Sequence, residues 1–156
     1  MSNTAMQMME MHSDSLQGLN LALVQECIEA CSASEQACTM CAGSMMSGMM
    51  SGMMSGTTGG GAMAQGDDSM AMCLDMCLNC ADMSNTMMRM MLRPTGMSQP
   101  AMRAMLQAMV VMCGACADAC DAQAKSNPDC AMCAEVCRQS MRVCQRMVDS
   151  MATKPM

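Results

Sequence analysis

The sequence of 156 residues contains no phenylalanine, tyrosine or tryptophan. Leucine, isoleucine and valine are also scarce, so a conventional apolar core would be thin for a chain whose length suits one domain. The 31 methionines can replace part of that core because their side chains are apolar and adaptable, but methionine specifies packing poorly. We therefore expect a second kind of residue to fix the interior.

Basic residues are few, since 8 lysines and arginines stand against 14 aspartates and glutamates, and the net charge is −6. This balance and the absence of a lysine or arginine cluster argue against a nucleic-acid-binding surface. The single histidine, His12, is interpreted as a solvated residue near the N-terminus. The lack of a Ser/His/Asp set, an acidic pair or a phosphate-binding loop argues against an enzyme.

Long apolar runs are absent as well. No stretch of about 18 apolar residues is present, so we expect no membrane-spanning helix and no membrane partner. The first residues, MSNTAMQMMEMHSDS, lack the basic start and the apolar core of a secretory signal peptide. As written, the sequence predicts a cytoplasmic protein, with a periplasmic or exported location as the alternative if a leader has been removed.

Cysteine is the residue that the sequence has in excess. Its 14 cysteines fall in four segments, at steps of three, four or seven residues that return to one face of an α-helix. Ser34, Ser84 and Ser140 lie on or near the same faces and are interpreted as small residues at tight packing positions. The candidate metal ligands are Cys27, Cys31, Cys38, Cys41, Cys73, Cys77, Cys80, Cys113, Cys116, Cys120, Cys130, Cys133, Cys137 and Cys144.

The pattern predicts an all-α protein, an antiparallel up-down-up-down four-helix bundle with a core of cysteine and methionine. Ser98 with Pro100, and Asn127 with Pro128, indicate where the third and fourth helices begin. The four helices are expected at about residues 14–43, 68–92, 99–125 and 128–152, which together make a single domain of residues 14–152.

Two segments outside these helices are rich in methionine. Residues 1–13 are predicted to form a flexible N-terminal tail. Residues 44–66 are predicted to form a flexible loop, because glycine recurs every fourth residue in the three MMSG repeats at 45–56. The first repeat could instead extend the preceding helix.

Alternating helix directions would bring nearly all the thiols to one end of the bundle. The cysteines lie in the C-terminal halves of the first and third predicted helices but toward the N-termini of the second and fourth. Methionines dominate the opposite half of the last three helices. Those on the cysteine-bearing faces are Met87, Met91, Met102, Met105, Met109, Met147 and Met151.

Thiolates and thioethers are soft ligands that favour Cu(I) among biological metals. Two thiols one helical turn apart can hold a Cu(I) ion between their sulfurs. Thiolates in an apolar interior are costly unless cations neutralise them, which predicts about one Cu(I) per cysteine and roughly 14 per chain. We predict that the seven methionines pass copper inward, and that the MMSG repeats either capture copper or act as a spacer. The pairs at this spacing are Cys27/Cys31, Cys73/Cys77, Cys116/Cys120 and Cys133/Cys137.

Other chemistries fit the cysteines less well. Intrahelical disulfides are disfavoured because Cβ atoms four residues apart are separated by about 5–6 Å, whereas a disulfide requires about 3.5–4.5 Å; disulfides between helices remain an alternative. A thiol–disulfide redox protein would normally carry one exposed CxxC at a helix start. Zinc or another soft metal in a metallothionein-like role, or an iron–sulfur cluster, is also an alternative, although discrete sites do not require continuous columns.

The sequence resembles the bacterial copper storage proteins over roughly residues 14–152. The likeness rests on the four Cys-lined helices with their repeated CxxxC pairs, on the Met-rich end of the bundle and on the Met-rich N-terminus. The resemblance implies a four-helix bundle that stores many Cu(I) ions on core cysteines and assembles as a homotetramer. Exported members tend to have methionine at the mouth of the bundle and cytosolic members histidine, and this sequence has the methionine type.

Overall fold

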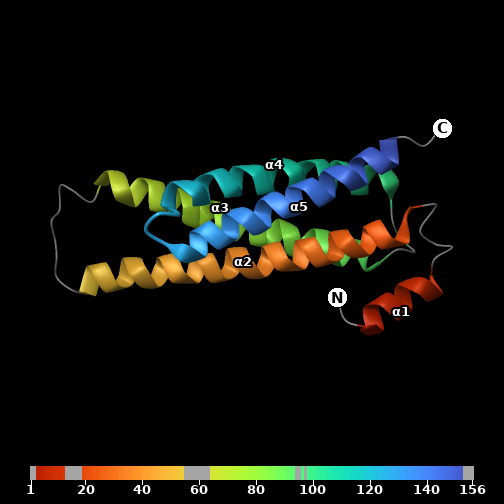
Figure 1. Ribbon diagram of the computed structural model, residues 1–156, viewed down its shortest axis with the longest axis horizontal. Helices are drawn as coiled ribbons and strands as arrows, with labels where there is room; N and C mark the ends of the chain where they lie inside the picture. Colours follow the sequence, from red (N-terminus) through yellow and green to blue (C-terminus); the bar gives the residue numbers. More distant parts are fainter. Residues whose placement is uncertain (1–2, 13–18, 55–63, 94–95, 97, 153–156) are drawn as a thin grey trace.

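The computed structural model describes residues 3–12, 19–54, 64–93, 96 and 98–152. Within these ranges the chain forms helices and no strand, which confirms the prediction of an all-α fold (Figure 1). A fifth helix lies ahead of the four that were predicted. The helices are α1 (Asn3–Met11), α2 (Leu21–Met54), α3 (Ala64–Met91), α4 (Gln99–Gln123) and α5 (Pro128–Ala152).

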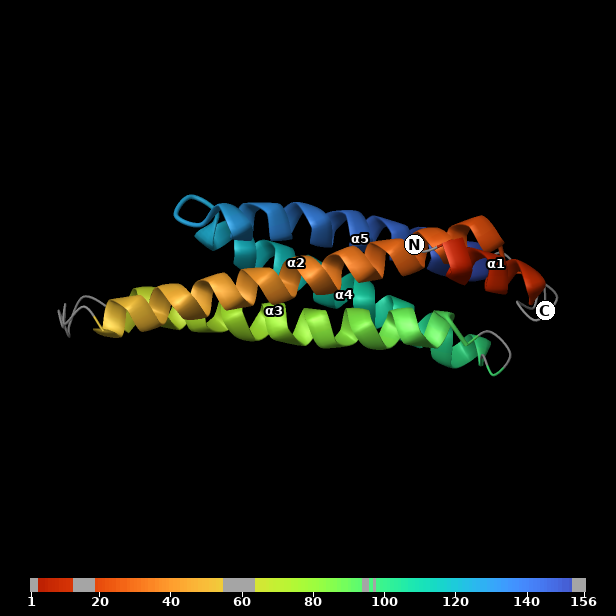
Figure 2. The same ribbon diagram turned by 90° about the horizontal axis from the view of Figure 1, so that it is seen from below.

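The four long helices, α2 to α5, lie side by side, and the short α1 lies beside the first turns of α2 (Figure 1, Figure 2). Helix α2 packs against α3 and α5, and α4 packs against the same two helices. Each long helix therefore has two neighbours, and the four enclose one interior. Successive long helices run in opposite directions (Figure 1).

Polar side chains cap α4 and α5 at the positions that the sequence predicts. Ser98 has extended backbone angles, φ −87° and ψ 116°, and its side chain accepts a hydrogen bond from the N–H of Ala101, with Pro100 in the first turn. The side chain of Asn127 accepts a hydrogen bond of 2.9 Å from the N–H of Asp129. Each cap satisfies an N–H that has no partner within its own helix, so the two starts are well defined.

The structure differs from the sequence prediction at the N-terminus. Residues 3–11 of the predicted flexible tail are helical, and Met9 is only 3% exposed. A helix of nine residues is too short to be stable alone, so packing of this methionine explains its order. Helix α2 begins one residue after Asn20, whose side chain accepts a hydrogen bond from the N–H of Leu23. The predicted helix start near residue 14 falls in residues 13–18, outside the described ranges.

The prediction of a flexible loop over 44–66 is wrong for much of its length. Helix α2 continues to Met54 and α3 begins at Ala64, so the first two MMSG repeats are helical, while residues 55–63 lie outside the described ranges. A glycine in a helix costs about 1 kcal/mol relative to alanine, but methionine is a good helix former. Met45, which opens the first repeat, is 1% exposed. Packing of this side chain offsets the cost of the glycines that follow it.

The two ends of the bundle differ. On the left of both views, α2 and α3 project beyond the turn between α4 and α5 (Figure 1, Figure 2). The turn is tied to the projecting pair by hydrogen bonds from Asn127 to Ser44, at 3.5 Å, and from Gln123 to Ser69, at 2.8 Å. We call this the thiol end. The opposite end, where α2 begins and α5 finishes, we call the thioether end.

Helix α4 is the one described helix that is long and apolar enough, by length and composition, to cross a membrane. The side chains on its inner face are at most 1% exposed, because α3 and α5 cover them. A helix in the core of a bundle passes the same test, so we interpret α4 as a core helix. The inner-face residues include Met102, Leu106, Met109, Cys113 and Cys116.

Candidate metal centre

All 14 cysteines lie in the interior of the bundle. Each is 0% exposed, and each is a free thiol. Helices α2, α3, α4 and α5 all contribute, because the spacing of three, four and seven residues keeps each column on the inward side of its helix. The structure therefore brings together every residue that the sequence predicts as a metal ligand.

The sulfur atoms of different helices approach one another closely. Cys41 Sγ on α2 lies 3.2 Å from Cys130 Sγ on α5, and Cys77 Sγ on α3 lies 3.5 Å from Cys120 Sγ on α4. Two four-thiol groups stand out, because all four sulfurs of each lie within 4.8 Å of one another. Each group takes one thiol from each long helix. The first group is Cys38, Cys80, Cys116 and Cys137, and the second is Cys41, Cys77, Cys120 and Cys133.

The two groups are in contact with each other. Cys133 of the second group lies 3.6 Å from Cys38 of the first, and Cys116 of the first lies 3.9 Å from Cys77 of the second. A sulfur in one group can therefore bridge to a metal ion held by the next. The eight thiols of the two groups form one connected set of soft ligands rather than two separate sites.

These distances also bear on the redox alternatives. An S–S bond is about 2.03–2.05 Å long, whereas the shortest Sγ–Sγ distance between two described helices, from Cys41 to Cys130, is 3.2 Å. Thiol–disulfide exchange further requires that a thiolate can reach its partner. With every cysteine 0% exposed, no CxxC pair is available to an external disulfide in this conformation. The geometry favours metal binding.

The interior has no charged side chain among the residues that the structure describes. The buried polar residues there are Ser34, Ser84 and Ser140. The ion pairs lie on the surface, where Arg138 contacts Asp118 and Asp121 and where Arg146 contacts Glu26. A thiolate in the interior consequently has no protein cation as a partner. It must be neutralised by a proton or by a bound metal ion.

The thiols hold their protons unequally. A hydrogen bond with Cys120, together with burial, raises the pKa of Cys73 to about 12. Burial likewise raises the pKa of Cys130. Neighbouring thiols can also make a cysteine easier to ionise, and the thiols of Cys27 and Cys31 lower the pKa of Cys144. Such sulfurs are the positions at which a proton is most easily replaced by a metal ion.

The seven methionines predicted as a copper uptake route lie at the thioether end. Five of them are 0% or 1% exposed and two, Met105 and Met151, are half-buried. They pack with Val24 and Leu106, so this half of the interior is an apolar core as well as a set of thioethers. Their role in uptake stays a prediction. The five buried methionines are Met87, Met91, Met102, Met109 and Met147.

Met45 is an interior sulfur that the sequence analysis did not assign to the core. It lies one helical turn after Cys41 on α2 and is 1% exposed. The four-residue step from Cys41 to Met45 and on to Met49 was the available signal. The glycines of the repeats masked it, because they favoured a loop.

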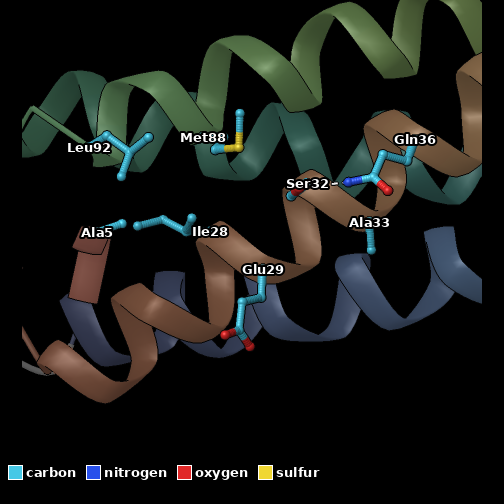
Figure 3. Close-up of a pocket in the computed structure, with 8 residues that line it drawn as sticks. All are labelled: Ala5, Ile28, Glu29, Ser32, Ala33, Gln36, Met88 and Leu92. Carbon is cyan, nitrogen blue, oxygen red and sulfur yellow. Dashed lines mark hydrogen bonds between the residues drawn. The ribbon is translucent and has the colours of Figure 1, made fainter. Parts of the chain in front are cut away.

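A surface pocket of about 350 Å³ lies outside this interior, between α1, α2 and α3 (Figure 3). Met88 supplies a thioether to its lining, and no cysteine takes part. The hydrogen bond from Gln36 to Ser32, at 3.1 Å, crosses one side of it. The pocket is thus unrelated to the thiols. Its lining consists of Ala5, Ile28, Glu29, Ser32, Ala33, Gln36, Met88 and Leu92.

Comparison with known proteins identifies the family. The sequence model of the Csp family, copper storage protein, matches residues 20–149. The chain belongs to this family. A search of curated proteins found no match.

Solved structures of the copper storage family have the same fold. The copper storage protein Ccsp from Streptomyces lividans, loaded with 10 copper equivalents, is 29% identical, with a TM-score of 0.70 over 86% of this chain and 89% of that one. A cytosolic copper storage protein from the same organism, with five coppers, is 29% identical, with a TM-score of 0.67 over 82% and 93%. A Ccsp variant with two histidines changed to alanine is 29% identical, with a TM-score of 0.69 over 85% and 98%.

Family membership confirms the predicted function at the level of copper storage. Copper is the partner, and the clustered interior thiols are suited to hold it. This copper storage protein differs from the prediction in the helical N-terminus and in the helical MMSG repeats.

Proposed function

We propose that this protein stores many Cu(I) ions on the thiolates of its 14 interior cysteines, at about one copper per thiol. One observation carries the proposal. Each four-thiol group gathers a cysteine from every long helix, with all its sulfurs within 4.8 Å, in an interior whose described residues include no charged side chain. Soft sulfur ligands in an uncharged surrounding favour a soft monovalent cation.

Charge distinguishes Cu(I) from zinc in this interior. Four thiolates with four Cu⁺ ions are neutral, so each ion simply takes the place of a thiol proton. Four thiolates with one Zn²⁺ ion keep two negative charges, and the described residues offer no buried cation to offset them. The same argument sets the stoichiometry, because each thiol that loses its proton needs one Cu(I) to stay neutral, up to one ion per cysteine.

The storage unit that we propose is an antiparallel up-down-up-down bundle of α2, α3, α4 and α5, with α1 outside it. Ligands from four packed helices are held close together before any metal binds. The Sγ contacts of 3.2–4.0 Å in the interior support this view. Loading would then require small side-chain movements rather than folding around each ion.

Copper reaches the thiols, in this proposal, through the thioether end. The thioether of methionine is neutral and binds Cu(I) more weakly than a thiolate, so an ion passes from methionine to cysteine downhill in free energy. Buried Met147 follows Cys144 by three residues on α5, which places thioether and thiol on one helix face.

We also propose that the protein works in the cytoplasm as a homotetramer. A relative described as a cytosolic copper storage protein supports the compartment. Exposed apolar side chains support assembly, since Val111 on α4 is 73% exposed and Leu78 on α3 is 41% exposed. Sedimentation equilibrium checks the assembly, and a monomer at micromolar concentration would contradict it.

The deciding experiment is an anaerobic titration of the fully reduced protein with Cu(I) against a competing Cu(I) chelator, with far-UV circular dichroism recorded alongside. We expect saturation near 14 ions per chain, one for each cysteine, with helix present throughout. Saturation at one or two ions would mean a chaperone or a sensor instead of a store. A parallel titration with Zn²⁺ should give weaker binding that Cu(I) displaces.

A further inference from the structure

Serine interrupts the columns of cysteine. On α2, Ser34 stands between two cysteines of the column, and on α5, Ser140 does the same. The two residues are 0% and 1% exposed, and their hydroxyls contact each other across the interior. Ser140 donates its proton to the carbonyl of Ala30 at 2.8 Å. Ser34 is therefore the donor in the serine pair, and both hydroxyls are fixed.

Ser84 on α3 lies at the same level. It is 0% exposed, and its Oγ is 4.0 Å from the Sγ of Cys80. Cys80 belongs to the first four-thiol group, as do Cys38 and Cys137. Each of the three serines lies three or four residues from its helix's member of that group, in the direction of the thioether end. We call Ser34, Ser84 and Ser140 the serine layer.

The thiols fall into two sets, one on each side of the serine layer. Toward the thioether end, the thiol of Cys27 on α2 donates a hydrogen bond of 3.8 Å to the carbonyl of Val143, the residue before Cys144 on α5, and Cys27 and Cys31 both act on the pKa of Cys144. We call Cys27, Cys31 and Cys144 the small set. The eleven other cysteines, the large set, are the two four-thiol groups together with their neighbours Cys73, Cys113 and Cys130.

Among the described residues, no Sγ–Sγ contact of 4.0 Å or less joins one set to the other. Among the described residues, every Sγ–Sγ contact of 4.0 Å or less joins two members of the large set. The small set is linked instead through the hydrogen bond from Cys27 to the carbonyl of Val143, next to Cys144. Between the two sets, Ser34 and Ser140 join α2 to α5 through their hydroxyls.

A hydroxyl cannot stand in for a thiol in this chemistry. It does not ionise in the physiological range, and its oxygen is a hard donor that suits magnesium or calcium better than Cu(I). A copper–thiolate network extends only where neighbouring sulfurs share ions. At the serine layer three of the four long helices supply oxygen. The fourth, α4, supplies Cys113, whose Sγ contact is with Cys80 of the large set, at 3.9 Å.

We propose that the serine layer divides the copper store into two compartments, and that Cys27, Cys31 and Cys144 form a separate Cu(I) site beside the thioether end. This inference rests on the proposed function and refines it. Two thiols one turn apart on α2 lie beside α5 at Val143 and Cys144, and three thiols so placed suit an ion with three sulfur ligands. The small set is the first group of thiols that an ion from the thioether end meets.

The first test adds sulfur atoms to the serine layer. In the anaerobic titration against a chelator, the natural protein should bind copper in two phases, a smaller one for the small set and a larger one for the large set. The double variant Ser34→Cys with Ser140→Cys should merge them into one phase and take up about two more ions, one for each added thiol. The matched control Ser34→Ala with Ser140→Ala removes the hydroxyls without adding sulfur, and should keep two phases.

The second test removes one set at a time. The triple variant Cys27→Ser, Cys31→Ser and Cys144→Ser should lose the smaller phase, while the ion number and affinity of the larger phase stay unchanged. The control of equal size, Cys38→Ser, Cys116→Ser and Cys137→Ser, should reduce the larger phase and spare the smaller one. Circular dichroism verifies that each variant is helical before copper is added.

The outcomes separate this inference from the function on which it rests. If the natural protein binds only one or two ions, copper storage itself fails. If it binds many ions in one phase, or if the small-set variant weakens binding of all remaining copper by tenfold or more, storage stands and the two compartments are refuted. Two phases that the alanine control keeps and the cysteine variant merges would establish the division.

Discussion

The two halves of the interior are buried to the same degree but differ in what their side chains can become. We call the half of the interior that holds the two four-thiol groups the thiol half, and the half next to the thioether end the thioether half. On α4, Cys116 of the thiol half and Met109 of the thioether half lie seven residues apart, and both are 0% exposed. A thiol can exchange its proton for a metal ion, whereas a thioether has no proton to exchange. The thioether half is thus a permanent apolar core, whereas the thiol half can exchange protons for metal ions.

This division explains how a chain without aromatic residues and with few aliphatic ones maintains a fold while its cargo comes and goes. Leu106 and Met147 pack in the thioether half as part of the hydrophobic core. Protonated thiols also pack as small apolar groups. We therefore expect the empty protein to be folded before copper binds.

The largest effect should come from filling the thiol half. Because Cu(I) binds the folded chain at many sites, loading should raise the free energy of unfolding by several kcal/mol, about 2.7 kcal/mol for one site at a hundredfold excess over its Kd. Thermal unfolding followed by circular dichroism, with and without copper under anaerobic conditions, measures this. Removal of the copper with a chelator should return the melting temperature to that of the empty protein. Equal melting temperatures for the two forms would show that the ions lie outside the folded core.

Paired substitutions on α4 should separate stability from capacity. Met109→Ala should destabilise the empty protein by about 2–5 kcal/mol, because it removes a fully buried side chain and leaves a cavity. Cys116→Ala removes one sulfur atom, so it should cost less stability but lower the copper capacity by about one ion. Urea denaturation and the copper titration together test the pair. If both variants lost stability and capacity alike, the two halves would not be independent.

The pH dependence of the empty protein should also originate in the thiol half. The pKa of Cys73 is about 12 in the folded chain, compared with about 8.5 for an unperturbed thiol. The raised pKa means that this residue contributes stability fully below about pH 8.5, and that the contribution is lost as the pH rises toward 12. Urea denaturation from pH 8 to 11 should show the decline, and Cys73→Ala should make it shallower. An unchanged slope in the variant would mean that this thiol does not titrate with unfolding.

Loading rates should distinguish the two ends. Met102→Leu with Met147→Leu keeps an apolar side chain of similar volume but removes two thioethers at the thioether end. We expect slower copper loading and an unchanged final capacity, measured by stopped-flow transfer from a Cu(I) chelate. Met45→Leu with Met49→Leu is the equivalent change at the thiol end, and should slow loading less. If neither pair changed the rate, methionine would serve packing alone.

The sequence was sufficient for the parts of the molecule that depend on one helix at a time. The spacing of the cysteines predicted their common burial, and Ser98 and Asn127 predicted the starts of α4 and α5 through local hydrogen bonds. Helix α1 and the extension of α2 were missed because they depend on tertiary packing of Met9 and Met45, which outweighs local propensity.

The serine layer could not be predicted for a different reason. Ser34 and Ser140 are 106 positions apart in the sequence, and they meet only because of how far α2 and α5 are shifted along each other. Spacing within a helix fixes which face a residue occupies but not the level of its partner on the next helix. Two serines in columns of cysteine therefore looked like small residues at tight packing positions. Only their contact between α2 and α5 identifies them as members of the serine layer.

The smallest effect concerns two glycines, one in each kind of surrounding. Gly48, in the projecting part of α2, has no heavy atom within 4 Å of the position of an added Cβ. Gly48→Ala should therefore stabilise the helix by up to about 1 kcal/mol. At Gly114 on α4 the added Cβ would lie 3.2 Å from the Sδ of Met141, so the same gain is reduced by the movement that this thioether must make. Urea denaturation should show a larger gain in the free energy of unfolding for Gly48→Ala than for Gly114→Ala. Equal gains would mean that the side chain of Met141 moves aside without loss of stability.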